Sequence, residues 1–299
     1  MDNAGYYQGL TLSNPMKTRR EFLSIAAGCL VLADAAVLLG AENKKPWKIG
    51  ICDWDLRGSG GVNAFAAAKE LGFEGVQVSY SPDGPDSLLN RTNRAKFLTA
   101  AKEADTAIAS FALGLLNGRP LATTPEAEGW VVDCLNAMDE MDVTRVLMPF
   151  FGEADVLEHK DHWPLIVEKL KRLAVIAERK KRVLAVESYL TAEDSIKMVD
   201  AVGSDAVKVY YDVRNSLNKK YDIFREIELL GSKKLICEIH FKEDTCRLGD
   251  GDIDFAKVCN TLEKIGYEDW IVVESAAPGN WKESQIANAQ FVKKLLGKL

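Results

Sequence analysis

The chain has 299 residues, of which 47% are hydrophobic and 27% charged, a balance typical of a protein with a large apolar core. The formal net charge of −6 argues against a nucleic-acid partner, because proteins that bind the phosphate backbone usually carry a basic face. Two domains would fit this length, but α/β barrels of this size commonly form one domain.

The N-terminal segment differs from the rest of the chain. Arg19 and Arg20 precede a largely apolar run over residues 25–40, and a polar, lysine-containing stretch follows that run. The apolar run is short for a segment that spans a bilayer. We therefore predict a twin-arginine export signal over residues 1–41, removed on delivery to the periplasm, followed by one domain over residues 45–299. An ordinary amphipathic N-terminal helix is the alternative.

Strand-like and helical patterns alternate along the remaining chain without a long linker. The strand-like runs cover Trp47–Trp54, Gly75–Tyr80, Ala107–Leu113, Arg145–Phe150, Val183–Glu187, Ala206–Asp212, Leu235–His240 and Trp270–Glu274. The helical patterns cover Gly61–Leu71, Arg94–Ala104, Pro125–Met141, Pro164–Lys180, Ala192–Val202, Asp222–Leu230, Phe255–Ile265 and Ser284–Leu296. This alternation indicates parallel β-α-β units, and eight of them over about 250 residues predict a single (β/α)8 TIM barrel. A doubly wound sheet fits less well, because no Gly-x-Gly-x-x-Gly motif follows the first run.

Glycines mark the ends of several helical patterns. Gly72, Gly203, Gly231 and Gly266 each follow a helical run. Glycine adopts the left-handed backbone conformation at little cost, so these positions predict C-terminal helix caps.

The six cysteines give no sign of a thiolate metal site. None of them forms a Cys-x-x-Cys pair, the spacing typical of such sites. Most of them lie within apolar strand or helix patterns, so we expect small core residues, although an exported protein could oxidise some of them.

Four ionisable residues each stand at the end of a strand-like run. They are Glu187, Asp212, His240 and Glu274. Burying a charge there is costly unless something compensates it. Because the strands of a parallel barrel all end on one face, we expect these side chains to converge. Three carboxylates and one imidazole predict a site for one divalent cation, Mn²⁺, Mg²⁺, Co²⁺ or Zn²⁺. Salt bridges to nearby lysines and arginines are the alternative.

This arrangement resembles the xylose isomerase-like barrel superfamily, and within it the sugar phosphate isomerase/epimerase group that includes tagatose epimerase-type enzymes. The shared pattern is Glu187, then Asp212-Val213-Arg214-Asn215, then His240 and Glu274, and the resemblance runs from about residue 45 to the C-terminus. It implies a metal-dependent sugar isomerase or epimerase. In that chemistry Glu187 and Glu274 bind the metal and also act as acid and base on either face of the substrate.

The same resemblance implies three substrate contacts. Glu193 lies six residues after Glu187, as a substrate-contacting glutamate does in that family, and a carboxylate in the first turn of a helix is the alternative. Arg247 lies one residue away from the place of the family's substrate arginine. Asn215 stands where tagatose epimerase-type members carry a histidine.

Other residues near the strand ends are further candidates for the site. Lys242 lies two residues beyond His240, so strand alternation places it on the same side, as a general acid or as a partner of Glu243. Trp54 and Phe150, at the ends of the first and fourth runs, are candidates for stacking on a sugar, with barrel packing as the alternative.

The remaining histidines, His159 and His162, lie in the loop before the fourth long helical pattern. Charged residues surround them in the sequence. We therefore expect solvated surface side chains at both positions.

The leading hypothesis is a periplasmic isomerase or epimerase that acts on an unphosphorylated sugar or sugar derivative, because sugar phosphates are chiefly cytoplasmic. A lyase or hydratase acting on 3-keto-sugars or 3-keto-glycosides uses the same proton chemistry and is an open alternative. A non-catalytic carbohydrate-binding protein is a third. Zinc endonuclease relatives are disfavoured, because they need many histidine ligands and a basic groove, whereas this chain has three histidines. Beyond the sugar, no nucleic-acid or membrane partner is expected after removal of the signal, and a homo-oligomer is an open alternative.

Overall fold

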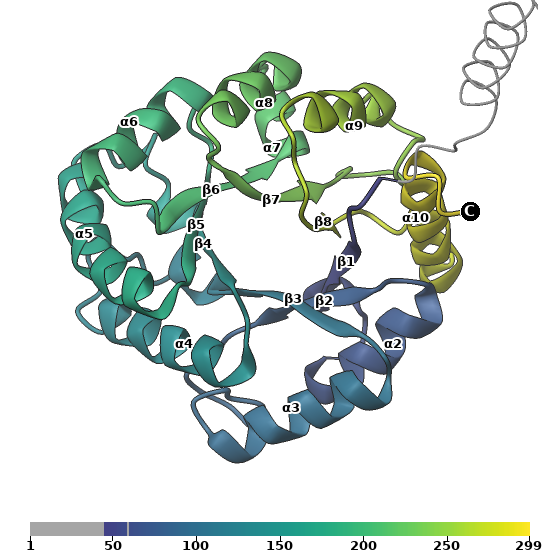
Figure 1. The fold of residues 1–299 in the computed structure, drawn as a ribbon, viewed down its shortest axis with the longest axis horizontal. Coiled ribbons are helices and arrows are strands. Elements are labelled where there is room, and N and C mark those ends of the chain that lie inside the picture. The colour runs from purple at the N-terminus through teal and green to yellow at the C-terminus, as the bar shows by residue number, and fades with distance from the viewer. Residues whose placement is uncertain (1–44, 59) are drawn as a thin grey trace, which may run out of the picture. The chain divides into compact units, whose positions relative to one another are not determined.

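Parallel strands close into a barrel within residues 45–299. The computed structural model describes residues 45–58 and 60–299, and the predicted export signal lies outside them. The eight strands pair in chain order, and the last strand pairs with the first. Figure 1 shows the strands at the centre and the helices in a ring around them. This confirms the predicted single (β/α)8 TIM barrel.

All eight strands were predicted, with differences of a few residues at their ends. They are β1 (Ile49–Cys52), β2 (Gly75–Ser79), β3 (Ala107–Ala112), β4 (Arg145–Phe150), β5 (Val183–Ser188), β6 (Val207–Asp212), β7 (Ile236–Phe241) and β8 (Ile271–Val273). The register of β6 and β7 places Asp212 opposite His240. Two of the predicted ligands are therefore direct neighbours across the sheet.

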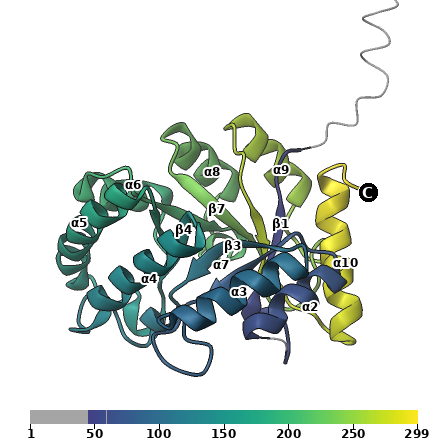
Figure 2. The ribbon, with the colours of Figure 1, turned by 60° about the horizontal axis from the view of Figure 1, so that its bottom comes forward.

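The long helices cover the outside of the strands, as Figure 2 shows from the side. They are α2 (Ala64–Leu71), α3 (Arg91–Glu103), α4 (Ala127–Met141), α5 (His162–Lys180), α6 (Ala192–Val202), α8 (Ile223–Ser232), α9 (Phe255–Lys264) and α10 (Trp281–Leu295). None of these described helices is long and apolar enough to cross a membrane. One further short helix, α7 (Val213–Asn218), begins directly after β6 and was not predicted.

Polar side chains at the first positions of the helices explain where several of them begin. Asn90, Thr191, Asp222, Asp254 and Asn280 each accept a hydrogen bond from a backbone N–H in the first turn of the helix that follows. These bonds satisfy N–H groups that have no partner inside the helix. The starts of these five helices are therefore encoded locally in the sequence.

Three of the four glycines predicted as helix caps have this role. Gly72, Gly203 and Gly266 follow their helices with positive φ angles. The prediction for Gly231 is wrong, because this residue lies inside α8. A Cβ atom there would lie 2.6 Å from the side chain of Ile265, so the glycine allows close approach of the chain at the end of α9.

Apolar side chains fill the layer between the strands and the helices, whereas the barrel interior holds smaller clusters. One interior cluster contains Ala112, Leu147, Ala185, Tyr210 and Cys237, and the other contains Cys52, Ala109, Trp270 and Val272. A Cβ atom on Gly75 would lie 2.5 Å from the Trp270 ring, so this indole fits inside the barrel only beside a glycine.

The five cysteines in the described part of the chain are free, and four of them are buried. The four are Cys52, Cys134, Cys237 and Cys259. The prediction that most cysteines are small core residues is confirmed for these positions.

Candidate active site

Four side chains from neighbouring strand ends meet at the C-terminal end of the barrel. They are Glu187 of β5, Asp212 of β6, His240 of β7 and Glu274, which directly follows β8, and one ligand atom from each lies within 4.8 Å of the others. The Nδ1 atom of His240 lies 3.2 Å from Oε1 of Glu187, 3.2 Å from Oε2 of Glu274 and 3.8 Å from Oδ2 of Asp212. The structure therefore brings together all four predicted metal ligands around one imidazole nitrogen.

The two oxygens of Asp212 have different surroundings. Oδ1 accepts hydrogen bonds of 2.8 Å from the backbone N–H groups of Arg214 and Asn215, so Asp212 is the N-terminal cap of α7. Oδ2 is buried and has no hydrogen-bond partner among the described residues. A buried carboxylate oxygen without a partner is costly. Because α7 fixes the first oxygen, the second is held toward the other three ligands.

A buried network below His240 selects which ring nitrogen faces the carboxylates. Nε2 of His240 lies 2.9 Å from Oε1 of Gln77, whose amide nitrogen donates to Oγ of Ser110 at 2.9 Å and to the hydroxyl of Tyr210 at 3.1 Å. Because the amide oxygen is an acceptor, the hydrogen of a neutral His240 ring lies on Nε2. Nδ1 then keeps its lone pair, which a metal ligand requires.

Burial and neighbouring charges shift the pKa values of the side chains in this cluster. Burial lowers the pKa of His240, but Glu187, Glu274 and Asp212 outweigh it and raise that pKa to about 9. Burial raises the pKa of Asp212, and Lys242 opposes this effect. For Glu274, the positive charges of His240 and Lys242 outweigh burial and lower the pKa. The cluster is therefore stabilised by positive charge placed among its oxygens.

This donor set fits a divalent cation. Oxygen donors with one imidazole are the ligands that Mn²⁺, Mg²⁺, Co²⁺ and Zn²⁺ accept, and the unpartnered Oδ2 of Asp212 offers a lone pair into the cluster. The thiol of Cys52 also lies beside the imidazole, but its Sγ is 3.5 Å from Nε2, the nitrogen that faces away from the carboxylates. The thiol is therefore not part of the donor set.

Lys242 and Trp54 both contact Glu274. Nζ of Lys242 lies 3.0 Å from Oε2 of Glu274 and 3.6 Å from Oδ2 of Asp212. Nε1 of Trp54 donates to Oε1 of Glu274 at 3.2 Å, and 44% of this tryptophan is exposed. Glu243, the alternative partner of Lys242, forms an ion pair with Arg214 instead. The structure therefore places Lys242 at the predicted site.

A cavity of about 410 Å³ opens above the cluster. Its lining is Trp54, Ser79, Ala112, Gly114, Asn117, Leu147, Pro149, Phe151, Glu187, Tyr189, Asn215, Lys242 and Glu274. Phe151 and Tyr189 were not predicted, and their ring centroids lie 4.6 Å apart. Phe150, the last residue of β4, was a candidate for stacking on a sugar. It is instead buried in the layer between strands and helices, which agrees with the alternative of barrel packing.

A second cavity of about 250 Å³ adjoins the first. The two cavities share Trp54, Lys242 and Glu274 as lining residues. The second cavity is also lined by Asp55, whose pKa burial raises to about 7, and by Trp281. Glu274 therefore lines both cavities.

Two predicted substrate contacts lie outside the lining of both cavities. Glu193 is in the first turn of α6 and forms an ion pair with Arg225. Nε of Arg247 lies 2.9 Å from Oδ2 of Asp250 on the surface. For Glu193 the structure agrees with the alternative prediction, a carboxylate in the first turn of a helix. Contact of either residue with a substrate stays a prediction that the structure does not support.

The chain is similar in sequence and fold to known proteins. Residues 65–295 match the family described as xylose isomerase-like TIM barrel. Similar solved structures include a D-psicose 3-epimerase in the presence of D-fructose (16% identity, TM-score 0.70, covering 84% of this chain and 99% of that one). They also include an L-ribulose 3-epimerase (18% identity, TM-score 0.69, covering 84% of this chain and 94% of that one). A third is a 3-keto-D-glucoside 4-epimerase from E. coli (17% identity, TM-score 0.68, covering 83% of this chain and 98% of that one). At these identities the solved structures show the fold alone. A comparison with curated proteins finds no match.

Proposed function

The chain belongs to the xylose isomerase-like TIM barrel family, and we propose that it is a divalent-metal-dependent isomerase or epimerase that moves a proton next to a carbonyl of an unphosphorylated sugar or sugar derivative. The observation that carries this proposal is the convergence of three carboxylates and one imidazole at the C-terminal end of the barrel, where two of them, Glu187 and Glu274, line a cavity. Active sites of TIM barrels lie at this end. The epimerases among the structures of similar fold support a sugar as the substrate.

Glu187 and Glu274 are suited to the proton transfer. A proton next to a carbonyl is weakly acidic, and a bound cation supplies positive charge where negative charge develops on oxygen. The two glutamates come from β5 and from the end of β8, the outer members of the four ligand-bearing strands. One carboxylate is thus placed to accept the proton and the other to return one from a different direction. Hydrogen bonds from Trp54 and Lys242 orient Glu274.

The lining of the main cavity favours a substrate without phosphate. Of the described residues that line it, Lys242 alone is cationic. That ammonium group already contacts Glu274 and Asp212. Phosphate groups are usually held by arginines, lysines or backbone N–H groups that are free to bind them. A phosphorylated sugar would instead place its charge beside carboxylates.

The experiment that tests the proposal is solvent exchange. Metal-loaded protein is incubated in D₂O with a panel of ketoses and 3-keto-glycosides, and deuterium uptake into the recovered sugar is measured. We expect one deuterium next to the carbonyl for at least one sugar, and none with protein stripped by a chelator or with His240→Ala. If sugars of the panel bind but none of them exchanges deuterium, the proposed enzyme activity is contradicted. A non-catalytic carbohydrate-binding protein is then the remaining hypothesis.

A second candidate is a lyase that acts on 3-keto-glycosides. The second cavity beyond Glu274 and the Lys242 ammonium on its wall favour it, because elimination needs space and a proton donor for the departing group. The proton next to the ketone is removed, a carbon–carbon double bond forms, and the glycosidic oxygen leaves with a proton. Release of the aglycone together with an unsaturated ketone identifies the lyase, whereas the epimerase leaves the glycosidic bond intact.

We also propose that the protein works in the periplasm. The paired arginines and the apolar run of the N-terminal segment support this location. Replacement of Arg19 and Arg20 by lysine should keep the protein in the cytoplasm, as fractionation of the cells will show. Unchanged delivery of that variant to the periplasm would contradict export by the twin-arginine route.

A further inference from the structure

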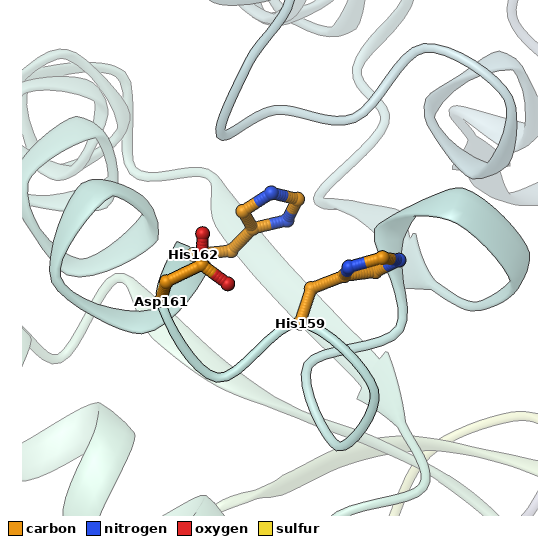
Figure 3. Close-up of side chains that lie close together, drawn as sticks. All are labelled: His159, Asp161 and His162. Carbon is orange, nitrogen blue, oxygen red and sulfur yellow. The ribbon is translucent and has the colours of Figure 1, made fainter.

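A second group of metal-binding side chains lies on the turn that leads into α5. It consists of His159, Asp161 and His162, shown in Figure 3, and one ligand atom from each lies within 4.8 Å of the others. The two imidazole rings are 4.9 Å apart between centroids and nearly parallel, with an angle of 21° between their planes. Both histidines are half-buried, so they remain at the surface but are only partly open to solvent.

The backbone holds this turn in one conformation. The N–H of His159 donates to the carbonyl of Asp155 at 2.9 Å, and the N–H of His162 donates to the carbonyl of His159 at 3.0 Å. Nδ1 of His162 is shielded from water and has no hydrogen-bond partner among the described residues. An imidazole nitrogen in that situation lacks the water it would bind at an open surface. The turn therefore presents a nitrogen without a partner beside two other potential ligands.

The donor atoms are close to the spacing that a metal ion requires. Two ligands that each lie about 2.1 Å from a zinc ion are separated by at most about 4.2 Å. The present limit of 4.8 Å therefore leaves an adjustment of several tenths of an ångström. Asp161 is exposed and both rings are half-buried, so side-chain rotation supplies that adjustment without moving the backbone.

We propose that His159, Asp161 and His162 form a second cation site, separate from the barrel cluster, that takes an imidazole-preferring ion such as Zn²⁺. Two imidazoles and one carboxylate suit Zn²⁺, Ni²⁺ or Cu²⁺, whereas the three carboxylates and one imidazole of the barrel also suit Mn²⁺ or Mg²⁺. The proposal does not rest on the enzyme activity.

The site would fasten the segment between β4 and α5. This segment covers residues 151–161. It starts with Phe151, which lines the main cavity, and His162, the first residue of α5, follows it. An ion bound to the turn joins the last residues of the segment to the first residue of the helix. The bound ion would therefore make this part of the cavity wall more rigid and raise the stability of the folded protein. It would take no part in the reaction itself.

Zinc titration of the untagged protein in a His240→Ala background tests the site. The chain has three histidines, so this background leaves His159 and His162 as the remaining imidazoles. We expect about one Zn²⁺ per chain by calorimetry, imidazole NMR signals of both histidines that shift with zinc, and slower hydrogen exchange over residues 151–161. Removing a residue that only hydrogen-bonds to a metal ligand usually lowers metal affinity by about 10- to 100-fold. Removing a ligand itself should therefore lower zinc affinity at least as much.

Asp161→Asn and Glu158→Gln form a matched pair, because each removes one negative charge from the same loop and only Asp161 belongs to the group. We expect the asparagine variant to lose at least tenfold in zinc affinity and the glutamine variant less than twofold. His159→Ala is the second ligand variant, in case one substitution perturbs folding. Equal losses in the matched pair, or zinc binding that leaves both imidazole signals unchanged, would overturn the proposal.

Discussion

Gln77→Met is expected to weaken metal binding without touching a ligand. Methionine has nearly the length of glutamine but no carbonyl oxygen, so the Nε2–H of His240 loses the acceptor that lies 2.9 Å away. In the metal-bound protein this leaves a buried donor without a partner, at a cost of about 1–3 kcal/mol. Hydrogen-bond partners of metal-bound histidines are worth about 10- to 100-fold in affinity, or roughly 1.4–2.8 kcal/mol. The two figures agree, and we expect a loss of this size.

The assay is competition with a chelator, which reads metal affinity directly and needs no substrate. Gln77→Glu is the matched control, because its carboxylate still accepts from Nε2–H, while the hydroxyls of Ser110 and Tyr210 are able to donate to it. We expect wild-type or higher affinity for that variant. A Met variant with a native fold and wild-type affinity, or a Glu variant that loses as much as the Met variant, would refute the role assigned to Gln77.

The remaining predictions concern the ligands and one glycine. Glu187→Gln and Glu274→Gln should still bind metal at high concentration but lose about 10²- to 10⁴-fold in deuterium exchange, the usual cost of removing a positioned acid or base. Asp212→Asn should weaken metal binding, and excess metal should restore part of the exchange. Because the pKa of His240 is raised to about 9, metal displaces a proton below that pH, so affinity should rise by up to about tenfold per unit from pH 6 and level off above pH 9. In metal-free protein the same shift stabilises the fold below about pH 6.5, and that contribution is lost as the pH rises through about 9. Gly75→Ala should destabilise the barrel by about 1–3 kcal/mol in thermal unfolding, since its Cβ would lie 2.5 Å from an indole ring.

Each of these predictions has a contrary outcome. For Asp212→Asn, metal affinity equal to that of the wild type would contradict its role as a ligand. Near wild-type exchange in both glutamine variants would exclude the glutamates as bases and make Lys242 the next candidate. A metal affinity that is flat from pH 6 to 9 would contradict the protonated state of His240. Gly50→Ala is the control for Gly75→Ala, because its Cβ would meet nothing closer than 3.4 Å, and equal losses would show that the Trp270 contact is not the cause.

The barrel could be predicted because its signals are local. Runs of β-branched residues alternate with helical patterns, and each β-α unit repeats them. Helix α7 was missed because its six residues are too few for a periodic pattern, although Asp212 before it is a typical capping residue. Gly231 was misassigned because a cap and a close contact between helices both select glycine, and the sequence does not show that Ile265 lies against it.

The four ligand positions could be predicted for a geometric reason. Strand ends of a parallel barrel share one face, so residues far apart in sequence are brought together by the fold itself. Gln77, Phe151 and Tyr189 were missed because their roles depend on contacts across the barrel or between loops. For Gln77 a signal was present: an amide stands inside the apolar run Gly75–Ser79, where a buried polar group needs a partner.

The double attachment of Asp212 limits how this site can change in evolution or by design. Exchange of a metal ligand for cysteine or histidine is an obvious route to a softer ion, but neither is a good N-terminal cap, and the helix it would release carries the Arg214 that pairs with Glu243. Asparagine keeps the cap and gives up the charge. Asp212 is therefore the ligand position that tolerates substitution least. A barrel of this design should acquire a new metal preference through changes in the residues around its ligands before Asp212 itself is replaced.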